Sequence, residues 1–166
     1  WQHCTVGFQY RFHPAMPQVR ELAARHGVLH FRACDELLAR YGADVDGIMA
    51  AHPIDTALWL LGDARAISLQ SDGISLIGRI SHERGISTHD YLIDTGPRQS
   101  SVSGASIINS QWQIIDLPPD DGMYRDALSA WLDWVEGGKR DERTATLADG
   151  LAVERVLAQV KHVSPA

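Results

Sequence analysis

The sequence predicts an α+β protein in which helices pack on one face of a large, mostly antiparallel or mixed β-sheet. A block rich in β-branched residues runs from about Ala64 to Leu117 and is interrupted by turn-forming residues. Before and after it, apolar residues recur at the spacing of helices. Helices and strands segregated along the chain in this way are typical of α+β folds. We expect residues 1–166 to form one domain, because this length suits a single sizeable core.

The chain is expected to open with a strand, a helix and a second strand. The stretch HCTVGFQYRF (3–12) is rich in β-branched and aromatic residues, which favours a strand ending at His13-Pro14. A helix that begins around Pro17 should end at Gly27, a typical C-terminal stop. The segment VLHFRA (28–33) predicts a short strand. Helical spacing then resumes at Cys34, Leu37, Leu38 and Tyr41.

The stretch GIMAAHPIDTALWLLG (47–62) predicts a further helix. A proline deep inside a helix costs about 3 kcal/mol, so Pro53 should lie in the first turn and the helix should begin near His52. Its apolar stripe is formed by Ile54, Ala57, Leu58 and Leu61, which Trp59 widens.

The central block predicts about five strands with an open sheet face. ISLIGRIS (74–81) and GISTHDYLID (85–94) alternate apolar and polar residues, as in an antiparallel sheet with one packed face. No remaining helix would cover the second face, which carries Ile77 and Arg79. We therefore expect a homodimer or higher homo-oligomer formed through this face. The other predicted strands are ARAISLQ (64–70), SSVSGASIIN (100–109) and QWQIIDL (111–117).

Two helices are expected to close the chain. Asp120 and Asp121 offer N-caps to the first, which Gly137-Gly138 should end, and Thr144 or Thr146 should cap the second. The apolar stripes are Tyr124, Ala127, Leu128, Trp131 and Val135 on the first helix, and Val153, Val156, Leu157 and Val160 on the second.

Composition argues against several classes of partner. A formal net charge of −6 disfavours nucleic acid and anionic membrane surfaces, which are bound by clustered basic residues. No apolar run approaches the roughly 20 residues of a membrane span, and the N-terminus lacks signal-peptide features. Cys4 and Cys34 are too few for a disulfide framework, so we expect reduced, half-buried thiols in the cytoplasm. Because the first residue is Trp, we expect the chain to be trimmed, processed or part of something longer.

The sequence contains no dinucleotide-binding motif and no recognisable metal site. Neither GxGxxG nor GxxxxGK[ST] occurs, so we expect this chain alone to bind no NAD(P). His26 and His30 should not share a helix face. His82 and His89 flank a hairpin and could approach each other, but no carboxylate–histidine cluster has ligand spacing. Hydrogen-bonded imidazoles are the better interpretation.

His52 and Asp55 are the candidates for chemistry. Residues three apart lie on adjoining parts of one helix face, so both could point into a common cleft. A histidine backed by a carboxylate can donate or accept a proton near neutral pH. The alternative is a hydrogen-bonding pair that only anchors the helix.

The same stretch resembles the "G…H-x-I-D-x-x-x-x-L-x-G" segment of the glucose–fructose oxidoreductase / inositol dehydrogenase / MocA family. VGFQYRFHP (6–14) and PQVRELAARHG (17–27) resemble the segments that open that family's second domain. SVSGASI (101–107) is similar to the glycine-containing segment late in that family's sheet. YRDALSAWLDWVEGGKR (124–140) and TLADGLAVERVLAQV (146–160) are similar to its closing helix pair.

The resemblance implies a function as well as a fold. It implies that the chain is the family's C-terminal α+β domain, a type of domain also found in glyceraldehyde-3-phosphate dehydrogenase. In this family the domain supplies the substrate site and the oligomer interface of an NAD(P)-dependent oxidoreductase. The substrate would be a sugar, a cyclitol or a related hydroxy or keto compound. His52 would then be the acid–base residue. Tyr10, Arg11 and Asp55 would contact the small-molecule substrate, with Tyr10 and Arg11 at the end of the first strand.

Three departures from the family pattern leave alternatives open, the first being that the stretch between Gly27 and His52 is shorter than usual. The nucleotide-binding domain is absent, so NAD(P) would require a joined or separate cofactor-binding chain. Ile48 also replaces the aspartate often found four residues before the histidine. The chain could instead be a stand-alone, cofactor-free isomerase, lyase or cyclase that uses His52, or a non-catalytic scaffold or partner protein.

Overall fold

The computed structural model describes residues 3–34, 49–93, 99–105, 112–118 and 120–164. The helices are the 3-10 helix η1 (Gln9–Phe12) and the α-helices α1 (Met16–His26), α3 (Ala51–Leu61), α4 (Asp121–Val135) and α5 (Leu147–Leu157). The strands are β1 (Val28–Cys34), β2 (Ala64–Ser71), β3 (Ser75–His82), β4 (Gly85–Leu92), β5 (Gln99–Ala105), β6 (Trp112–Asp116) and β7 (Lys161–His162).

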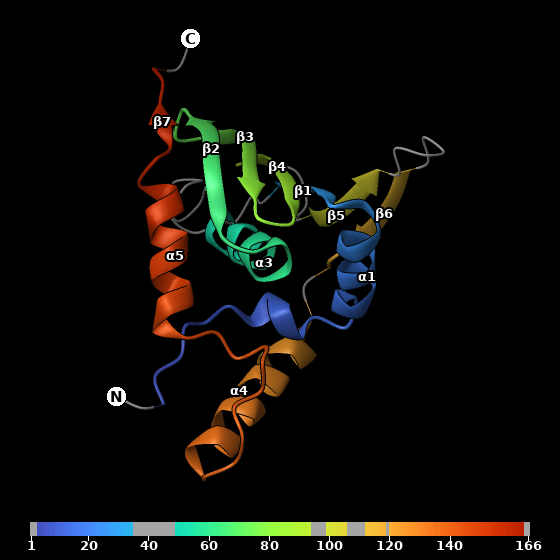
Figure 1. Cartoon of the computed structure of the whole chain (residues 1–166), viewed down its shortest axis with the longest axis vertical. Coiled ribbons are helices and arrows are strands. Elements are labelled where there is room, and N and C mark those ends of the chain that lie inside the picture. The colour runs from blue at the N-terminus through green and yellow to red at the C-terminus, as the bar shows by residue number, and fades with distance from the viewer. Residues whose placement is uncertain (1–2, 35–48, 94–98, 106–111, 119, 165–166) are drawn as a thin grey trace.

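The strands form one mixed sheet of order β6-β5-β1-β4-β3-β2-β7. Strand β1 lies in the middle, parallel to β4 and antiparallel to β5, although it precedes both by more than fifty residues. The remaining pairs are antiparallel except β2 with β7. Helices α1, α3 and α5 lie on one side of this sheet (Figure 1). The predicted α+β class with a mostly antiparallel, mixed sheet is confirmed.

The two faces of the sheet differ in burial as the alternation predicted. Leu29, Phe31, Leu76, Ile80 and Tyr91 point to the helices and are almost completely buried. On the other face Ile77 is 60% exposed and its neighbours include Arg79 and Asp90. The hydrophobic core therefore lies between the inner face and helices α1 and α3.

The predicted opening strand is wrong. Residues 3–8 form no strand, and residues 9–12 form η1, in which His13 N donates to Tyr10 O at 3.0 Å. A strand with one packed face would bury alternate residues, yet Tyr10, Arg11 and Phe12 are all buried. The 3-10 turn lets these consecutive side chains enter different parts of the core, so tertiary packing overrides β propensity.

The ends of α1 and α3 follow the predicted signals. Pro17 and Pro53 each lie in a first helical turn, and α3 begins at Ala51. Gly27 ends α1 with a φ of 61°, a left-handed conformation that glycine adopts without strain. A Cβ atom on Gly85 would lie 2.0 Å from the carbonyl oxygen of Gly27, so a second glycine is needed where β4 begins.

Three other boundaries refine the predictions. Thr146, rather than Thr144, caps α5. That helix ends at Leu157, and the residues beyond it form the short edge strand β7. Cys34 closes β1, so it does not start a helix, and the rest of the helix predicted to Tyr41 lies outside the described residues.

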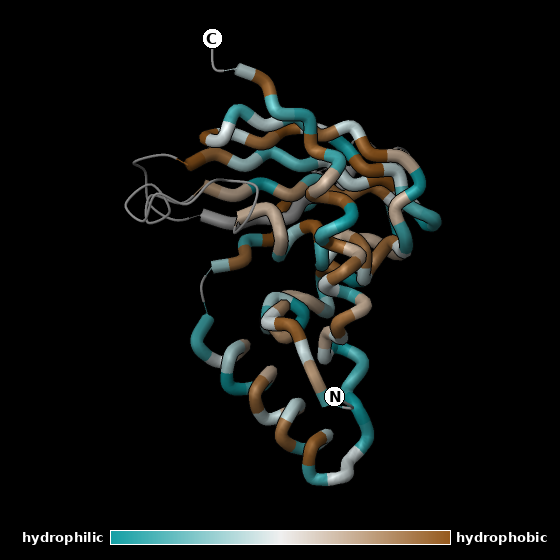
Figure 2. The backbone as a smooth tube through the Cα atoms, turned by 90° about the vertical axis from the view of Figure 1, so that its left-hand side faces the viewer, coloured by the Kyte–Doolittle hydropathy of each residue, from teal (hydrophilic) through white to brown (hydrophobic). Residues whose placement is uncertain are grey.

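Helix α4 extends away from the sheet and contacts mainly η1 (Figure 2). Asp120 caps its start through the Gly122 amide, as predicted. Much of its apolar stripe remains exposed: Tyr124, Leu128, Leu132 and Val135 are each 42–55% exposed. None of the described helices has the length and apolar character of a membrane span. The side chains of Cys4 and Cys34 are both half-buried.

A continuous chain of buried polar groups crosses the inner face of the sheet. The ring of His82 has Nδ1 2.9 Å from the carbonyl oxygen of Gly62 and Nε2 2.8 Å from Ser87 Oγ. Ser87 Oγ lies 2.7 Å from His89 Nε2, and His89 Nδ1 meets the hydroxyl of Tyr91. The two histidines do approach each other, as their positions beside the hairpin suggested, and a serine hydroxyl joins them.

The chemistry of these groups sets the direction of every hydrogen bond. A carbonyl oxygen only accepts, so His82 donates through Nδ1–H and its neutral ring accepts the Ser87 proton at Nε2. Ser87 then accepts from His89, whose other nitrogen accepts from Tyr91. A proton added to His89 would place a charge among these buried groups, away from water. Burial lowers the pKa of His89 to about 3, with repulsion from His82 and His30 adding to the effect, and burial also lowers the pKa of His82.

Replacing His89 with Gln is expected to reduce the acid sensitivity of folding. Unfolded histidine titrates near pH 6.5, so the unfolded chain binds more protons than the folded one below that pH, and the free energy of unfolding falls as pH falls. Well below pH 6.5, each histidine that stays neutral in the folded protein lowers the free energy of unfolding by about 1.4 kcal/mol for every unit by which the pH falls. Urea unfolding from about pH 7.5 down to about pH 5 should show a smaller slope for His89→Gln.

His162→Gln, on the exposed strand β7, is the control for this experiment. It should leave the slope unchanged. Equal slopes for the original chain and His89→Gln would mean that His89 does not remain neutral in the folded protein.

Candidate functional site

The start of α3 packs against η1 and brings His52 and Tyr10 together. The two ring centroids lie 5.3 Å apart in an edge-to-face arrangement, and the ring of Phe8 approaches His52 at 5.9 Å. Tyr10 is 8% exposed, whereas His52 is half-buried. The His52 carbonyl accepts a hydrogen bond from Thr56 Oγ1, which holds the first turn of the helix. Two predicted site residues, 42 positions apart in the sequence, are therefore neighbours.

Arg11 and Asp55, the other predicted site residues, bind each other. Arg11 Nε donates to Asp55 Oδ2 at 2.9 Å and Arg11 Nη2 to Asp55 Oδ1 at 2.5 Å. Both side chains are buried, with exposed fractions of 2% and 1%. The parallel hydrogen bonds are the bidentate geometry in which a guanidinium holds a carboxylate most strongly. Asp55 therefore contacts Arg11 while His52 contacts the aromatic rings, so these contacts do not form the common cleft expected for His52 and Asp55.

Asp149 is a third member of this ion cluster that the sequence did not single out. Its Oδ1 accepts from Arg11 Nη2 at 3.0 Å. Its Oδ2 accepts from both the backbone amide and the hydroxyl of Thr146, each at 2.6 Å, which completes a capping box at the start of α5. The Thr-x-x-Asp spacing signals that cap in the sequence, but nothing local signals the contact with Arg11.

The cluster remains charged at neutral pH. Burial raises the pKa of Asp55 to about 6, and the hydrogen bonds from Arg11 limit the rise. Hydrogen bonds from Thr146 and Arg11 lower the pKa of Asp149 despite its partial burial, while the two carboxylates raise the pKa of Arg11. One cation is thus shared by two carboxylates where η1, α3 and α5 meet.

Arg11 also lines two surface hollows. The larger, about 390 Å³, lies between η1, α1 and α3 and includes Arg20, Trp59 and Arg143. The smaller, about 200 Å³, lies between α3 and α5 and includes Asp55, Trp59 and Asp149. The guanidinium groups of Arg20 and Arg11 approach the Trp59 ring at 4.5 and 5.5 Å. His52 is not among the residues that line either of these two hollows.

Among the described residues there is no metal-ion cluster, and no glycine-rich loop opens their α-helices. No group of three His, Cys, Asp or Glu side chains among them is arranged to hold a metal ion. A dinucleotide pyrophosphate binds where a glycine-rich loop opens a helix. Within the described ranges, α3 follows Ala50, while α4 and α5 begin at Asp120 and Thr146, whose caps already occupy N-terminal amides. Ile48 lies outside the described residues.

The fold agrees with that of solved sugar dehydrogenases. No protein-family model matches the chain, and no curated protein matches its sequence. Among solved structures, the WlbA (WbpB) dehydrogenase from Thermus thermophilus, in complex with NAD and UDP-GlcNAcA, has a TM-score of 0.71 at 14% identity, covering 98% of this chain and 57% of that one. A dehydrogenase from Chromobacterium violaceum has a TM-score of 0.73 at 14% identity, covering 94% and 59%.

A third neighbour is the UDP-N-acetylglucosamine 3-dehydrogenase GnnA from Acidithiobacillus ferrooxidans. It has a TM-score of 0.69 at 15% identity and covers 96% of this chain and 61% of that one. These neighbours are of the glucose–fructose oxidoreductase / inositol dehydrogenase / MocA type, so the predicted resemblance is confirmed at the level of the fold. The chain spans less than two thirds of the length of the dehydrogenases it matches.

Replacing Asp55 with Ala is expected to lower the free energy of unfolding by about 3–5 kcal/mol, because it leaves the buried Arg11 charge with only Asp149. The double variant Arg11→Met/Asp55→Leu removes both charges and should lose much less stability than the sum of the single changes. Urea unfolding of the single and double variants measures the coupling.

The exposed ion pair between Arg20 and Glu142 provides the matched control. Glu142→Ala should change stability little, since exposed pairs contribute little. Additive losses for Arg11 and Asp55 would contradict a tightly coupled pair.

Proposed function

We propose that this chain supplies the substrate-binding and oligomerisation part of an NAD(P)-dependent oxidoreductase that acts on a sugar, a cyclitol or a related hydroxy or keto compound. The observation that carries this proposal is the fold agreement over 98% of the chain with a dehydrogenase solved in complex with NAD and UDP-GlcNAcA. The cofactor would come from a nucleotide-binding domain joined to this chain or from a separate chain, since the sequence contains no glycine-rich dinucleotide-binding motif.

The proposed acid–base residue is His52. A half-buried imidazole beside the Tyr10 ring can give a proton to, or take one from, a substrate oxygen, because its ordinary pKa lies close to neutrality. Phe8 and Tyr10 both contact the ring edge-to-face, which favours an ordered imidazole of the kind that proton transfer needs. Tyr10 would contact the substrate beside it.

Arg11 and Asp55 would act mainly as positioning residues in this proposal. Their ion pair joins η1 to α3, the two elements that carry Tyr10 and His52. Direct contact between this pair and the substrate stays a prediction. It is supported by the fact that both residues line the smaller hollow.

The open sheet face supports the proposed oligomer. Exposed apolar residues on it include Ile77, Ile86 and Leu92, and the described helices do not cover them. Arg32 and Asp90 approach to 3.8 Å on the same face, which gives it a mixed apolar and charged character. Such a composition suits a contact between two copies of the chain.

UDP-N-acetylglucosamine is expected to stabilise the chain against thermal unfolding. A ligand at a hundredfold excess over its dissociation constant raises the free energy of unfolding by about 2.7 kcal/mol. His52→Gln should weaken binding by about threefold to tenfold, the effect of losing one hydrogen bond. Calorimetric titration of both proteins measures this change, with His162→Gln as the control.

The proposal fails if neither UDP-N-acetylglucosamine nor a panel of sugars, cyclitols and their keto forms stabilises the chain. That result would favour the non-catalytic scaffold. Turnover of such a compound by this chain without NAD(P), abolished in His52→Gln, would instead identify the cofactor-free enzyme.

Ile77→Asp is expected to convert a dimer or higher oligomer into monomers, because it places a charge on the apolar part of the open face. Light scattering during size-exclusion chromatography at micromolar concentration measures the mass. Ile74→Asp is the matched control, since Ile74 is 55% exposed but lies in the turn before β3. A monomeric mass for the unmodified chain would contradict the proposed interface.

A further inference from the structure

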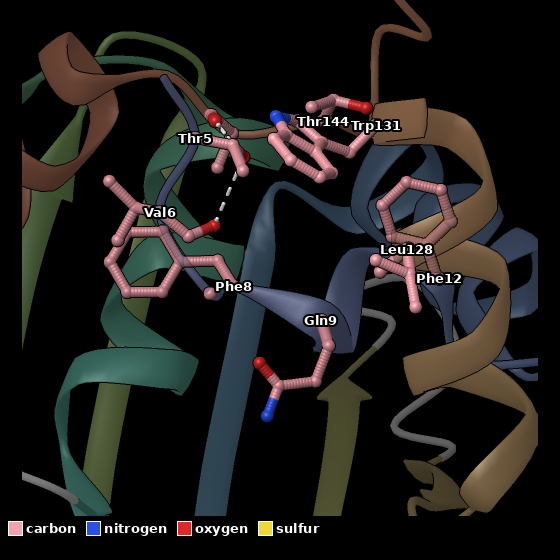
Figure 3. Close-up of a pocket in the computed structure, with 11 residues that line it drawn as sticks. Thr5, Val6, Phe8, Gln9, Phe12, Leu128, Trp131 and Thr144 are labelled. Carbon is pink, nitrogen blue, oxygen red and sulfur yellow. Dashed lines mark hydrogen bonds between the residues drawn. The ribbon is translucent and has the colours of Figure 1, made fainter. Parts of the chain in front are cut away.

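The N-terminal segment, α4 and the loop before α5 enclose a hollow that the proposed function does not use. Its volume is about 150 Å³. Figure 3 shows Phe8, Phe12, Leu128 and Trp131 as its larger side chains, contributed by segments more than a hundred residues apart. His52 and Tyr10 are not part of this lining, although Phe8, which lines the hollow, also contacts the His52 ring.

The size and lining of the hollow suit one aromatic ring. An engineered cavity of similar volume lined by Leu, Ile and Phe binds benzene. Here Val6, Ala127 and Ala145 complete a mainly apolar wall, so water inside it has few hydrogen-bond partners. Trp131 Nε1 already donates to His3 O at 2.7 Å, which fixes the indole and leaves that donor engaged. Aromatic walls favour another ring through edge-to-face and offset-stacked contacts.

One polar group of the lining lacks a partner. Thr144 is 3% exposed, and its Oγ1 has no hydrogen-bond partner in the part of the chain that the structure describes. The other threonine of the lining is satisfied, because Thr5 Oγ1 donates to Ala145 O at 2.6 Å. A buried hydroxyl without a partner is destabilising, so a ligand hydroxyl that pairs with it gains affinity.

The hollow opens onto the exposed stripe of α4. Leu128 belongs both to the lining and to the stripe and is 55% exposed. Tyr124 and Leu132, one turn to either side, are also exposed. An apolar ligand can therefore enter from the surface of α4 without local unfolding.

We propose that this hollow is a binding site for a single aromatic ring bearing a hydroxyl group, that is, a phenol-class ligand, with Thr144 as its hydrogen-bond partner. The ring lies among Phe8, Phe12 and Trp131, and its hydroxyl group pairs with Thr144 Oγ1.

Phenol and benzene are the probes for this site. The chain is labelled with 5-fluorotryptophan, the Trp131 resonance is assigned with Trp131→Phe, and each probe is titrated while the ¹⁹F spectrum is recorded. Phenol should shift the Trp131 resonance saturably with a Kd of about 1 mM or lower. Benzene should bind about threefold to tenfold more weakly, because it leaves Thr144 unpaired.

Two variants and a control separate the site from non-specific binding. Ala127→Leu fills the hollow and should abolish the saturable shift, whereas Ser129→Leu adds the same side chain to an exposed position of α4 and should retain it. Thr144→Val is nearly isosteric and removes the buried hydroxyl that lacks a partner, so this variant should unfold at a higher urea concentration than the original chain. It should also bind phenol and benzene equally.

The proposal is overturned by a shift that does not saturate, by unchanged binding in Ala127→Leu, or by a preference for phenol that survives Thr144→Val. Thr144→Val keeps the test decisive if Ala127→Leu does not fold. These outcomes are independent of sugar binding, since no variant alters His52 or Tyr10.

Discussion

The buried ion cluster around Arg11 is the interaction on which the rest of the structure depends. One guanidinium binds Asp55 of α3 and Asp149 of α5, so three elements from the beginning, middle and end of the chain meet at one charge. Burying these groups costs free energy, and only their mutual hydrogen bonds offset that cost. The cluster therefore specifies one arrangement of η1, α3 and α5, because any displacement would leave a buried charge without its partner.

The sheet has a matching asymmetry. Its inner face hides a hydrogen-bonded chain from His82 to Tyr91 in which both imidazoles are neutral, and its outer face presents exposed side chains such as Ile77. β1 enters between β4 and β5, so a strand from near the start of the chain lies between two strands that follow it by more than fifty residues. The inner face is thus committed to the core, while outer-face side chains such as Ile77 and Ile86 remain exposed among the described residues.

The arrangement separates structural and chemical roles that looked alike in the sequence. His52 and Asp55 are three residues apart, yet one packs against aromatic rings at half-exposure and the other is enclosed in an ion pair. The interpretation of this pair as a helix anchor therefore applies to Asp55, and the acid–base interpretation remains available to His52. The solved dehydrogenases that share this fold are longer than this chain, which spans 57% and 61% of two of them.

Local chemistry alone determined the class of the fold and many of its boundaries. Pro17, Gly27 and Pro53 act through their own backbone geometry, so they mark the same helix ends in any environment. The strand alternation likewise identified which face of β3 and β4 is buried. The tertiary structure decided what depends on distant partners. Residues 9–12 have the composition of a strand, but Arg11 must reach Asp55 and Asp149, so the segment turns into η1. The contacts of Tyr10 with His52 and of Thr144 with a hollow of α4 arise in the same way, because no local pattern encodes which distant segment will lie beside a side chain.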